Sequence, residues 1–564
     1  MGKLKTVGYE LRDVAVMQAP VSFCNHRGDV NPFINVCDRE VYPIFVSPMA
    51  SVTDQNNYKT WIENKLTPVV PRSVQKSENN PNGLTFEERM ELAKETFVSV
   101  SLKEAQNELM EYLVQKSVEG KKVKDMDRKA WGKQIGNAGC LLNKYYICVD
   151  IAHGTLSELY DICKKIKSLY EDYIIIMTGN VANPAAYSFY ADAGIDWMRA
   201  TIGSGCFTPD MCVVTKDGLK KICDIKIGDM VLTHTGEFHA VTHVHEYQKN
   251  EKLIQINDIK CTANHLFYVV NQKDFSNLMN QDISKYAYWI PANELDKENH
   301  YLVKKDSETK LCIIENIEYF DYNGKVYDLT VSTDETYNIN GIIVHNSRCT
   351  SSANVSIHYG TATLLDQLNE ERKAYAHSHN GNAPTKIIAD GGIGWFDDIQ
   401  KALALGADAV MAGKIFAECE EACEPIYWAK SLEDAEDKTK RQYNVMWKDT
   451  VLHVESDIQI DKCSTNSLEE LKLNVKPYKP FRDYYGMSTK KSQKLIGDNK
   501  CKLKTSEGID KPVEVKHPVA KWIDNMQSYL RSCMTYTNSH TIKELRENAQ
   551  VIILGGSGDA AYRK

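Results

Sequence analysis

A cysteine and an asparagine stand at the two ends of one segment, and each could react with the backbone beside it. The thiol of Cys206 can take over the acyl group of the preceding residue, and the hydroxyl of Ser347 can then accept that group. Asn346 can cyclise on its own backbone carbonyl and cut the chain, with His345 beside it as the acid. These residues predict that segment 206–346 is excised and that the flanking chains are joined.

A threonine and a histidine three positions apart lie between these two ends. Thr262 and His265 carry a hydroxyl and an imidazole that could polarise the peptide bond before Cys206. Taken alone, such a pair is more often structural than catalytic. Its place between a thiol nucleophile and an asparagine able to cleave the chain favours the catalytic interpretation.

A second candidate nucleophile follows the segment. Once residues 206–346 are removed, Gly203-Ser204-Gly205 is joined directly to Ser347-Arg348-Cys349. Backbone N–H groups in a Gly/Ser loop can hold a phosphate, and an electropositive pocket favours the thiolate. Cys349 is therefore predicted to be a nucleophile, whereas a buried structural thiol is the expectation for most of the sixteen cysteines.

Short apolar runs alternate with helix-like segments on both sides of residues 206–346. Continuous apolar runs are typical of strands buried between helices, which indicates an α/β fold with parallel strands. Because Gly, Asp, Asn and His follow the runs, we predict a TIM (β/α)8 barrel with its site at the carboxyl ends of the strands. A doubly wound sheet is the alternative, since spacing does not reveal closure. The runs are Val41–Val46, Tyr145–Val149, Ile174–Met177, Lys386–Ile388 and Ala409–Met411.

Residues 206–346 have a different pattern. Their strand-like pieces are short and separated by turn signals such as Thr235-Gly236, which predicts an inserted all-β domain. Ala240–Glu246 and Leu253–Ile256 are expected to be separate strands, and Lys310–Ile317 a single strand. We predict three parts: the first part of the barrel at residues 1–205, the insert at 206–346, and the second part of the barrel, with the Cys349 loop and a flap, at 347–564.

The insert resembles the Hint domain of inteins along its whole length. The resemblance implies an autocatalytic mini-intein without an endonuclease, in which Asp328 is a further splicing residue. Glu335 stands where many inteins carry a histidine. The segments that carry the resemblance are Cys206 with Ile227-Gly228-Asp229, Thr262 with His265, Val326–Val331, and Asn340–Asn346.

The chain outside the insert resembles the IMP dehydrogenase/GMP reductase family of barrels. The matching motifs include Asp150-Ile151-Ala152-His153-Gly154, Gly179-Asn180-Val181-Ala182, the joined Cys349 loop, Ala389-Asp390-Gly391-Gly392-Ile393, Gly406–Gly413 and Tyr484-Tyr485-Gly486-Met487-Ser488. One departure is Met49-Ala50-Ser51-Val52, where Ala50 replaces the family's aspartate.

The resemblance implies how the site works. Cys349 would form a covalent intermediate at C2 of a purine nucleotide, and a hydride would move between that carbon and a nicotinamide. Asp150 and Gly203 would lie near the dinucleotide, and carbonyls of Gly203, Gly205 and Cys349 would hold a monovalent cation such as K+. The residues implied to bind the nucleotide are Ser347, Asp390, Gly391, Gly392, Gly413, Tyr484, Gly486, Met487 and Ser488. Taken without the resemblance, Asp390 could instead be a turn-forming residue before two glycines.

The reaction direction rests on the flap. No Arg-Tyr pair of the kind that activates water in the dehydrogenases occurs there, whereas Lys504–Gly508 is similar to the Ser-Glu-Gly segment of GMP reductases. The implied catalytic residues are Cys349, Thr350, Ser351 and Glu507. We expect a reductase that converts GMP to IMP and ammonia with NADPH. The alternatives are an IMP dehydrogenase using NAD, or an idle barrel in which only splicing is active, an idea that Ala50 motivates.

Composition limits the classes of partner. The 564 residues carry a net charge of −8, which gives no general attraction to nucleic acid or anionic lipid. No apolar run approaches the roughly 18 residues of a membrane helix, and the start of the chain lacks a hydrophobic signal segment. We therefore expect a cytoplasmic enzyme that binds GMP or IMP, with no nucleic-acid or membrane partner. The family resemblance implies a homotetramer.

Overall fold

The computed structural model divides the chain into two compact units. One unit comprises Met1–Met17, Thr201–Leu364 and Val551–Lys564, and the other comprises Gln18–Ala200 and Leu365–Gln550. The structure describes residues 9, 11–118, 141–151, 153–200, 207–262, 265–273, 283, 286–292, 295–305, 308–331, 336–345, 359–441, 478–487, 489–496 and 510–554.

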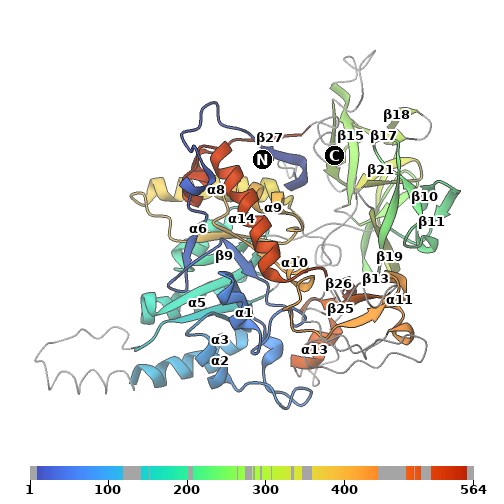
Figure 1. Cartoon of the computed structure of the whole chain (residues 1–564). Helices are drawn as coiled ribbons and strands as arrows, with labels where there is room; N and C mark the ends of the chain where they lie inside the picture. Colours follow the sequence, from blue (N-terminus) through green and yellow to red (C-terminus); the bar gives the residue numbers. More distant parts are fainter. Residues whose placement is uncertain are drawn as a thin grey trace, which may run out of the picture. The chain divides into compact units, whose positions relative to one another are not determined.

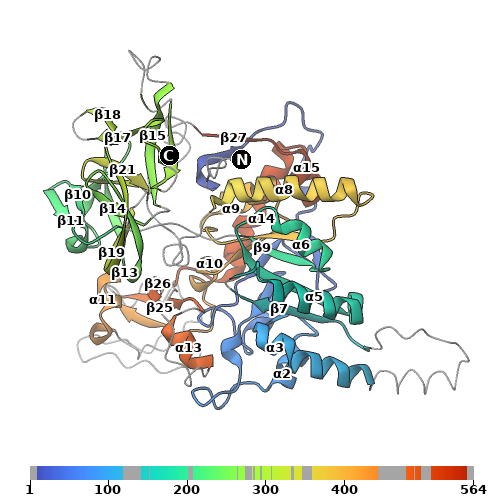
Figure 2. The same ribbon diagram turned by 180° about the vertical axis from the view of Figure 1, so that it is seen from behind.

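The second unit is built on a closed barrel of eight parallel strands (Figures 1 and 2). The closing contact is between β23 and β4, where Val410, Met411 and Ala412 pair with Ile44, Phe45 and Val46. The structure thus confirms a barrel rather than an open doubly wound sheet. In order around the barrel the strands are β22 (Lys386–Asp390), β23 (Ala409–Ala412), β4 (Ile44–Val46), β5 (Thr67–Val70), β6 (Phe97–Val100), β7 (Tyr145–Asp150), β8 (Ile174–Val181) and β9 (Trp197–Ala200).

Large apolar side chains fill the interior of the barrel. The ring of Phe45 lies 5.8 Å from that of Phe97 and 5.1 Å from that of Trp197, each in an edge-on arrangement. Met177 and Met411 complete the same buried cluster. Strands covered on both faces have little room for polar residues, which explains why β4, β5 and β6 are buried along their whole length.

Helices follow the barrel strands along the chain. Helix α5 packs on β8, and α9 packs on β23. Helices of the barrel region in the described part of the chain include α1 (Tyr58–Glu63), α2 (Phe86–Leu92), α3 (Leu102–Gln106), α5 (Ser157–Tyr170), α6 (Ala186–Asp192), α8 (Thr361–Ser378), α9 (Phe396–Ala404), α10 (Lys414–Ala417), α14 (Val519–Tyr536) and α15 (Ile542–Asn548). Among the described residues, no helix is long and apolar enough to cross a membrane.

Smaller elements complete the two units. Strands β2 (Ile34–Val36) and β3 (Arg39–Val41) form a hairpin, and β1 (Val14–Val16) pairs with β27 (Val551–Ile553). A three-stranded sheet consists of β24 (Tyr427–Ala429), β25 (Lys479–Tyr485) and β26 (Asp510–Glu514). The short helices α11 (Leu432–Glu436) and α13 (Lys490–Ile496) lie near this sheet in the chain.

An all-antiparallel β region stands in the chain between β9 and α8, as the turn-rich pattern predicts (Figure 1). Its core contains Phe207, Phe267 and Tyr337, all fully buried. Its strands are β10 (Cys212–Thr215), β11 (Gly218–Lys221), β12 (Met230–Leu232), β13 (Phe238–Ile256), β14 (Ile259–Cys261), β15 (Leu266–Asn271), β16 (Ala287–Pro291), β17 (His300–Lys305), β18 (Thr309–Ile313), β19 (Ile317–Val331), β20 (Thr336–Ile339) and β21 (Ile342–His345).

Two strand boundaries in this region differ from the sequence prediction. The pieces Ala240–Glu246 and Leu253–Ile256 belong to the single strand β13, which pairs with β19 from Val241 to Ile256. The run Lys310–Ile317 is instead divided between β18 and the start of β19. The polar stretch between the two predicted pieces continues the strand because its backbone is paired in the ladder, a long-range contact that local polarity does not report.

Candidate active site

Two carboxylates at the carboxyl ends of barrel strands are joined by one guanidinium. Asp150 is the last residue of β7, and Asp390 is the last residue of β22. Arg199 of β9 reaches both: its Nη1 lies 2.7 Å from Asp150 Oδ1, and its Nη2 lies 2.8 Å from Asp390 Oδ2. Asn180 of β8 donates a further hydrogen bond to Asp390 Oδ2 at 3.0 Å. Two residues predicted to serve the dinucleotide and the nucleotide therefore belong to one polar network.

The network is nearly closed to solvent. The side chains of Arg199, Asp150 and Asp390 are 8%, 17% and 12% exposed. Burial alone would lower the pKa of Arg199, but the charges of Asp390 and then Asp150 outweigh it and raise that pKa well above its usual value. The guanidinium is thus a permanent cation between two acids. Arg199 was missed from the sequence, although a charged residue inside the buried run Trp197–Ala200 was the available signal.

Cys148, which is buried beside this network, has a structural role. Arg199 Nη1 approaches its Sγ at 3.8 Å. Burial raises the pKa of this thiol to about 12, so it stays protonated at neutral pH.

Glycines follow two of the barrel strands, as the motifs predict. After Asp390, Gly391 and Gly392 have φ angles of 123° and 71°, in the region that favours glycine. Among the described residues, no atom lies within 4 Å of the position that a Cβ of Gly392 would take. This turn leaves space beside the end of β22 for a ligand.

Gly413 lies at a close contact between three segments. A Cβ atom on Gly413 would lie 2.6 Å from Met49 Sδ and 2.9 Å from Tyr484 Oη. Met49 follows β4, Gly413 follows β23, and Tyr484 belongs to β25. The structure therefore brings the predicted nucleotide residues Gly413 and Tyr484 together at the same end of the barrel as Asp390.

Replacing Gly413 with alanine is expected to displace Tyr484 and Met49 and to weaken nucleotide binding. The added methyl group overpacks the contact, at a cost of about 1–3 kcal/mol. Thermal unfolding and calorimetric titration with GMP and IMP measure the two effects. Gly28→Ala is the matched control, because a Cβ there meets no described atom within 4 Å. Unchanged stability and affinity in Gly413→Ala would contradict the close contact.

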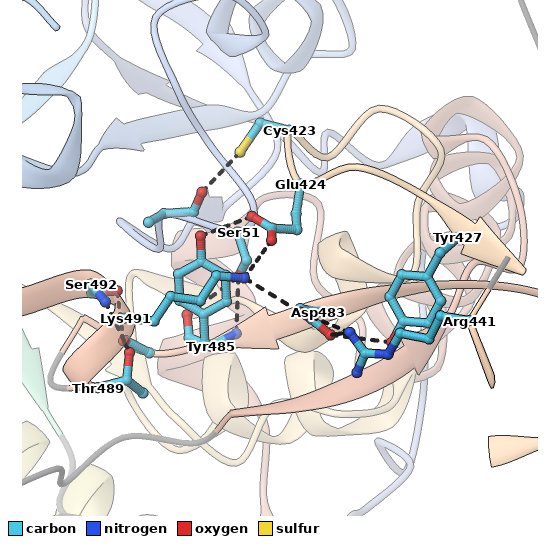
Figure 3. A network of polar contacts seen from close by, with 12 residues as sticks. Ser51, Cys423, Glu424, Tyr427, Arg441, Asp483, Tyr485, Thr489, Lys491 and Ser492 are labelled. Carbon is cyan, nitrogen blue, oxygen red and sulfur yellow. Dashed lines mark hydrogen bonds and ion pairs between the residues drawn. The ribbon is translucent and has the colours of Figure 1, made fainter. Parts of the chain in front are cut away.

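Ser51, in the loop after β4, is hydrogen-bonded to β25, the strand that contains Tyr484. The backbone N–H of Tyr485 donates to Ser51 Oγ at 3.2 Å, and the Ser51 hydroxyl donates to the carbonyl of Tyr485 at 3.3 Å (Figure 3). The side chains of Tyr484 and Tyr485 lie on opposite faces of β25, because successive strand residues alternate. The two hydrogen bonds between Ser51 and Tyr485 thus fix the part of the β25 backbone that places Tyr484 beside Gly413.

On its other face, β25 borders a cavity of about 740 Å³. There the Tyr485 hydroxyl donates to Glu424 at 2.8 Å, and Lys491 Nζ lies 2.5 Å from the other oxygen of that carboxylate (Figure 3). Cys423 Sγ donates to the carbonyl of Ala50 at 3.1 Å. Burial first and Glu424 second raise the pKa of Tyr485. Ala50 lines this cavity.

Gly486 is held by the helix that follows it. Its carbonyl accepts hydrogen bonds from the hydroxyls of Thr489, at 2.8 Å, and Ser492, at 3.0 Å (Figure 3). Met487 follows it in a turn before α13. Ten residues of the predicted sites lie outside the described part of the chain: Cys206, Asn346, Ser347, Cys349, Thr350, Ser351, Glu507, Ser488, Gly203 and Gly205. Their roles stay predictions.

The antiparallel region brings together the described residues of the predicted splicing site. Thr262, His265 and Asp328 are each at most 1% exposed. The His265 ring lies 3.9 Å from the ring of Phe207, and the His265 backbone N–H donates to the Thr262 carbonyl at 3.1 Å. Phe207, which follows Cys206 in the chain, exchanges two backbone hydrogen bonds with Tyr327, the residue before Asp328.

The residues before Asn346, at the other predicted end of the insert, pair with the strand that follows His265. Val344, two positions before Asn346, is paired with Phe267 of β15, and His345 is paired with Thr336 of β20. His265 directly precedes β15. The described residues next to both predicted junctions therefore meet the segment that carries Thr262 and His265.

Comparison with known proteins agrees with this architecture. A family model described as an IMP dehydrogenase / GMP reductase domain matches residues 132–225, 356–437 and 469–561. The gap between the first two segments, residues 226–355, contains β12 to β21 of the antiparallel region, whereas β10 and β11 lie in the first matched segment. The chain therefore contains an IMP dehydrogenase/GMP reductase domain that is split into segments, which confirms that resemblance at the level of the domain.

Individual relatives match a shorter stretch. The inosine-5'-monophosphate dehydrogenase of Aquifex aeolicus (strain VF5) is 31% identical over 173 residues, and that of Escherichia coli (strain K12) is 30% identical over 172 residues. Each match covers 30% of this chain and 27% of the relative. The chain thus spans about a quarter of the length of these relatives.

Proposed function

We propose that the barrel is an NAD(P)-dependent oxidoreductase acting at C2 of a purine nucleotide, and that the full chain is its self-splicing precursor. The main support for the oxidoreductase is the pair Asp150 and Asp390, which Arg199 holds at the carboxyl ends of barrel strands. This end of a barrel is where such enzymes place their sites. The match to a family domain supports the same activity.

The described residues fit a nucleotide. Asp390 is fixed by two donated hydrogen bonds, from Asn180 and from Nε of Arg199, and by its ion pair with Arg199. Its carboxylate can accept the hydroxyls of a ribose. The open turn at Gly392 offers backbone N–H groups to a phosphate, and the Tyr484 hydroxyl beside Gly413 is a further donor. Ser347 and Ser488 would complete this cradle.

The described residues also fit a dinucleotide beside the nucleotide. Asp150 belongs to the same network, where its carboxylate can hold ribose hydroxyls of the cofactor. The family resemblance implies that Gly203 serves the dinucleotide as well. The bound nicotinamide supplies or accepts a hydride. A K+ ion at the carbonyls of Gly203, Gly205 and Cys349 would order the Cys349 loop.

For the direction of the reaction we propose GMP reduction. This rests on Glu507 and Ser351, which would deliver the proton for ammonia loss after Cys349 attacks C2, with Thr350 beside the nucleophile. IMP oxidation is the second candidate, favoured by the relatives in Aquifex aeolicus and Escherichia coli that are named inosine-5'-monophosphate dehydrogenase.

The joined barrel is expected to oxidise NADPH when given GMP, because its flap lacks the Arg-Tyr pair that activates water. Absorbance at the reduced nicotinamide band follows GMP with NADPH, and IMP with NAD, in parallel. Cys349→Ala is the control that abolishes covalent attack. Formation of NADH from IMP without turnover of GMP would establish the dehydrogenase instead. Absence of both reactions would leave splicing as the active chemistry of the chain.

Splicing is supported by the core of the antiparallel region. Thr262 and His265 lie beside Phe207, next to the first predicted junction, and the strand that follows His265 is paired with Val344, next to the second. A His and a Thr at the first junction can polarise its peptide bond, and Cys206 then receives the acyl group. Ser347 accepts that group, and Asn346 releases the insert by cyclising, with His345 as the acid.

A further inference from the structure

Tyr337 makes a hydrogen bond that the proposed splicing chemistry does not yet use. Its hydroxyl donates to Oδ1 of Asp328. Both side chains are fully buried, in the core that also contains Phe207 and Tyr327. A carboxylate removed from water is held in place by its hydrogen-bond donors, and losing one has a larger effect there than at the surface.

The position of Tyr337 connects the elements of the proposed splicing site. Through β20 it is paired with Val344 of β21, on the strand that leads to Asn346. Its ring lies 6.1 Å from that of Phe207, the residue after Cys206. Phe207 and Tyr327 exchange both backbone hydrogen bonds, at 2.7 and 2.6 Å, so the backbone beside Asp328 is tied to the chain beside Cys206.

We propose that Tyr337 is a positioning residue for the first step of splicing, which it serves by holding the Asp328 carboxylate on the strand that is hydrogen-bonded to Phe207, the residue after Cys206. The inference rests on the proposed splicing activity and deepens it. In that step the Cys206 thiol loses its proton, the sulfur bonds to the carbonyl carbon of Gly205, and the Gly205–Cys206 C–N bond breaks as its nitrogen gains a proton. Tyr337 touches none of these atoms and acts through Asp328.

The test isolates that step in the full-length chain. With Asn346→Ala blocking release of the insert, added dithiothreitol cleaves the thioester at Cys206, and the rate of this cleavage reports the first step. Tyr337→Phe keeps the ring and removes only the hydroxyl. We expect it to slow thiol-induced cleavage by about tenfold, which is the size of one hydrogen bond to a charged group.

A second parent variant shows whether Tyr337→Phe affects only the first step or disturbs the whole core. With Cys206→Ala blocking the first step, cleavage after Asn346 should change less than twofold in Tyr337→Phe. Tyr319→Phe on β19 is the matched control, because this tyrosine is 56% exposed on the strand that carries Asp328. Equal slowing of both cleavages would overturn the inference, since it would mean a loosened core.

A double-mutant cycle tests whether Tyr337 acts through Asp328. In an Asp328→Ala background, which removes the acceptor of the Tyr337 hydroxyl, Tyr337→Phe should slow thiol-induced cleavage no further. Full additivity of the two changes, or an unchanged rate in the single Tyr337→Phe variant, overturns the inference. Failure of the Asn346→Ala parent to release any fragment with dithiothreitol overturns the splicing proposal itself, so the two failures are distinguishable.

Discussion

The double variant Cys206→Ala, Asn346→Ala is expected to accumulate as the intact chain of 564 residues, whereas the unmodified chain yields a shorter joined product and the free insert. Without the thiol no acyl group is transferred, and without the Asn side chain no cyclisation releases the insert. Mass spectrometry of the protein purified after expression measures all three species directly.

Single variants and a control sharpen that result. Cys206→Ala still permits cleavage after Asn346, and Asn346→Ala still permits cleavage before Cys206, so each yields a different pair of fragments. Cys212→Ala removes a thiol only six positions away, on β10, and should splice normally. An unmodified chain that remains at full length would contradict self-splicing.

Replacing Arg199 with leucine is expected to have the largest effect on the barrel. Two carboxylates that are less than one-fifth exposed would lose their shared cation. Removing one partner of a buried ion pair costs about 3–5 kcal/mol of folding free energy. We expect the affinity for GMP or IMP to fall at least about tenfold as well, since Asp390 loses its ion pair and one of its two hydrogen-bond donors. Denaturant unfolding and calorimetric titration measure the two effects.

A second buried arginine of the barrel is the matched control. Arg372 Nη1 lies 2.9 Å from Asp408 Oδ2, and the side chains are 10% and 13% exposed. Asp408 precedes β23, at the opposite end of the strand from Gly413. Arg372→Leu should therefore destabilise the fold without changing nucleotide affinity. Arg199→Lys keeps one charge but lacks the fork that reaches both carboxylates, so its affinity should be intermediate. Parental affinity in a folded Arg199→Leu variant would contradict the role of the network.

Local patterns were enough to predict most of the scaffold. Continuous apolar runs marked β4, β7, β8, β22 and β23, since strands covered on both faces exclude polar residues. The turn-rich stretch marked the antiparallel region, because frequent glycine turns favour hairpins. Asp150 and Asp390 could be selected from the sequence because they stand in motifs that resemble those of the IMP dehydrogenase/GMP reductase family.

Contacts between distant segments required the tertiary structure. Barrel closure depends on the pairing of β23 with β4, and no spacing along the chain encodes that register. Strand β13 continues through a polar stretch because β19 pairs with its backbone. The serine bonds that fix the strand of Tyr484 likewise join residues far apart in sequence.

The sequence by itself determined which residues carry reactive groups and which segments are buried strands, because side-chain chemistry and hydrophobic periodicity are local properties. Only the tertiary structure decided which of those groups share a site. Arg199 joins Asp150 to Asp390 because β7, β8, β9 and β22 are neighbours in the barrel, and Tyr337 meets Asp328 because two strands fold onto one core. The contacts of Arg199 depend on long-range packing, which brings together charges that no local motif connects, and the contact of Tyr337 depends on how two successive strands pack.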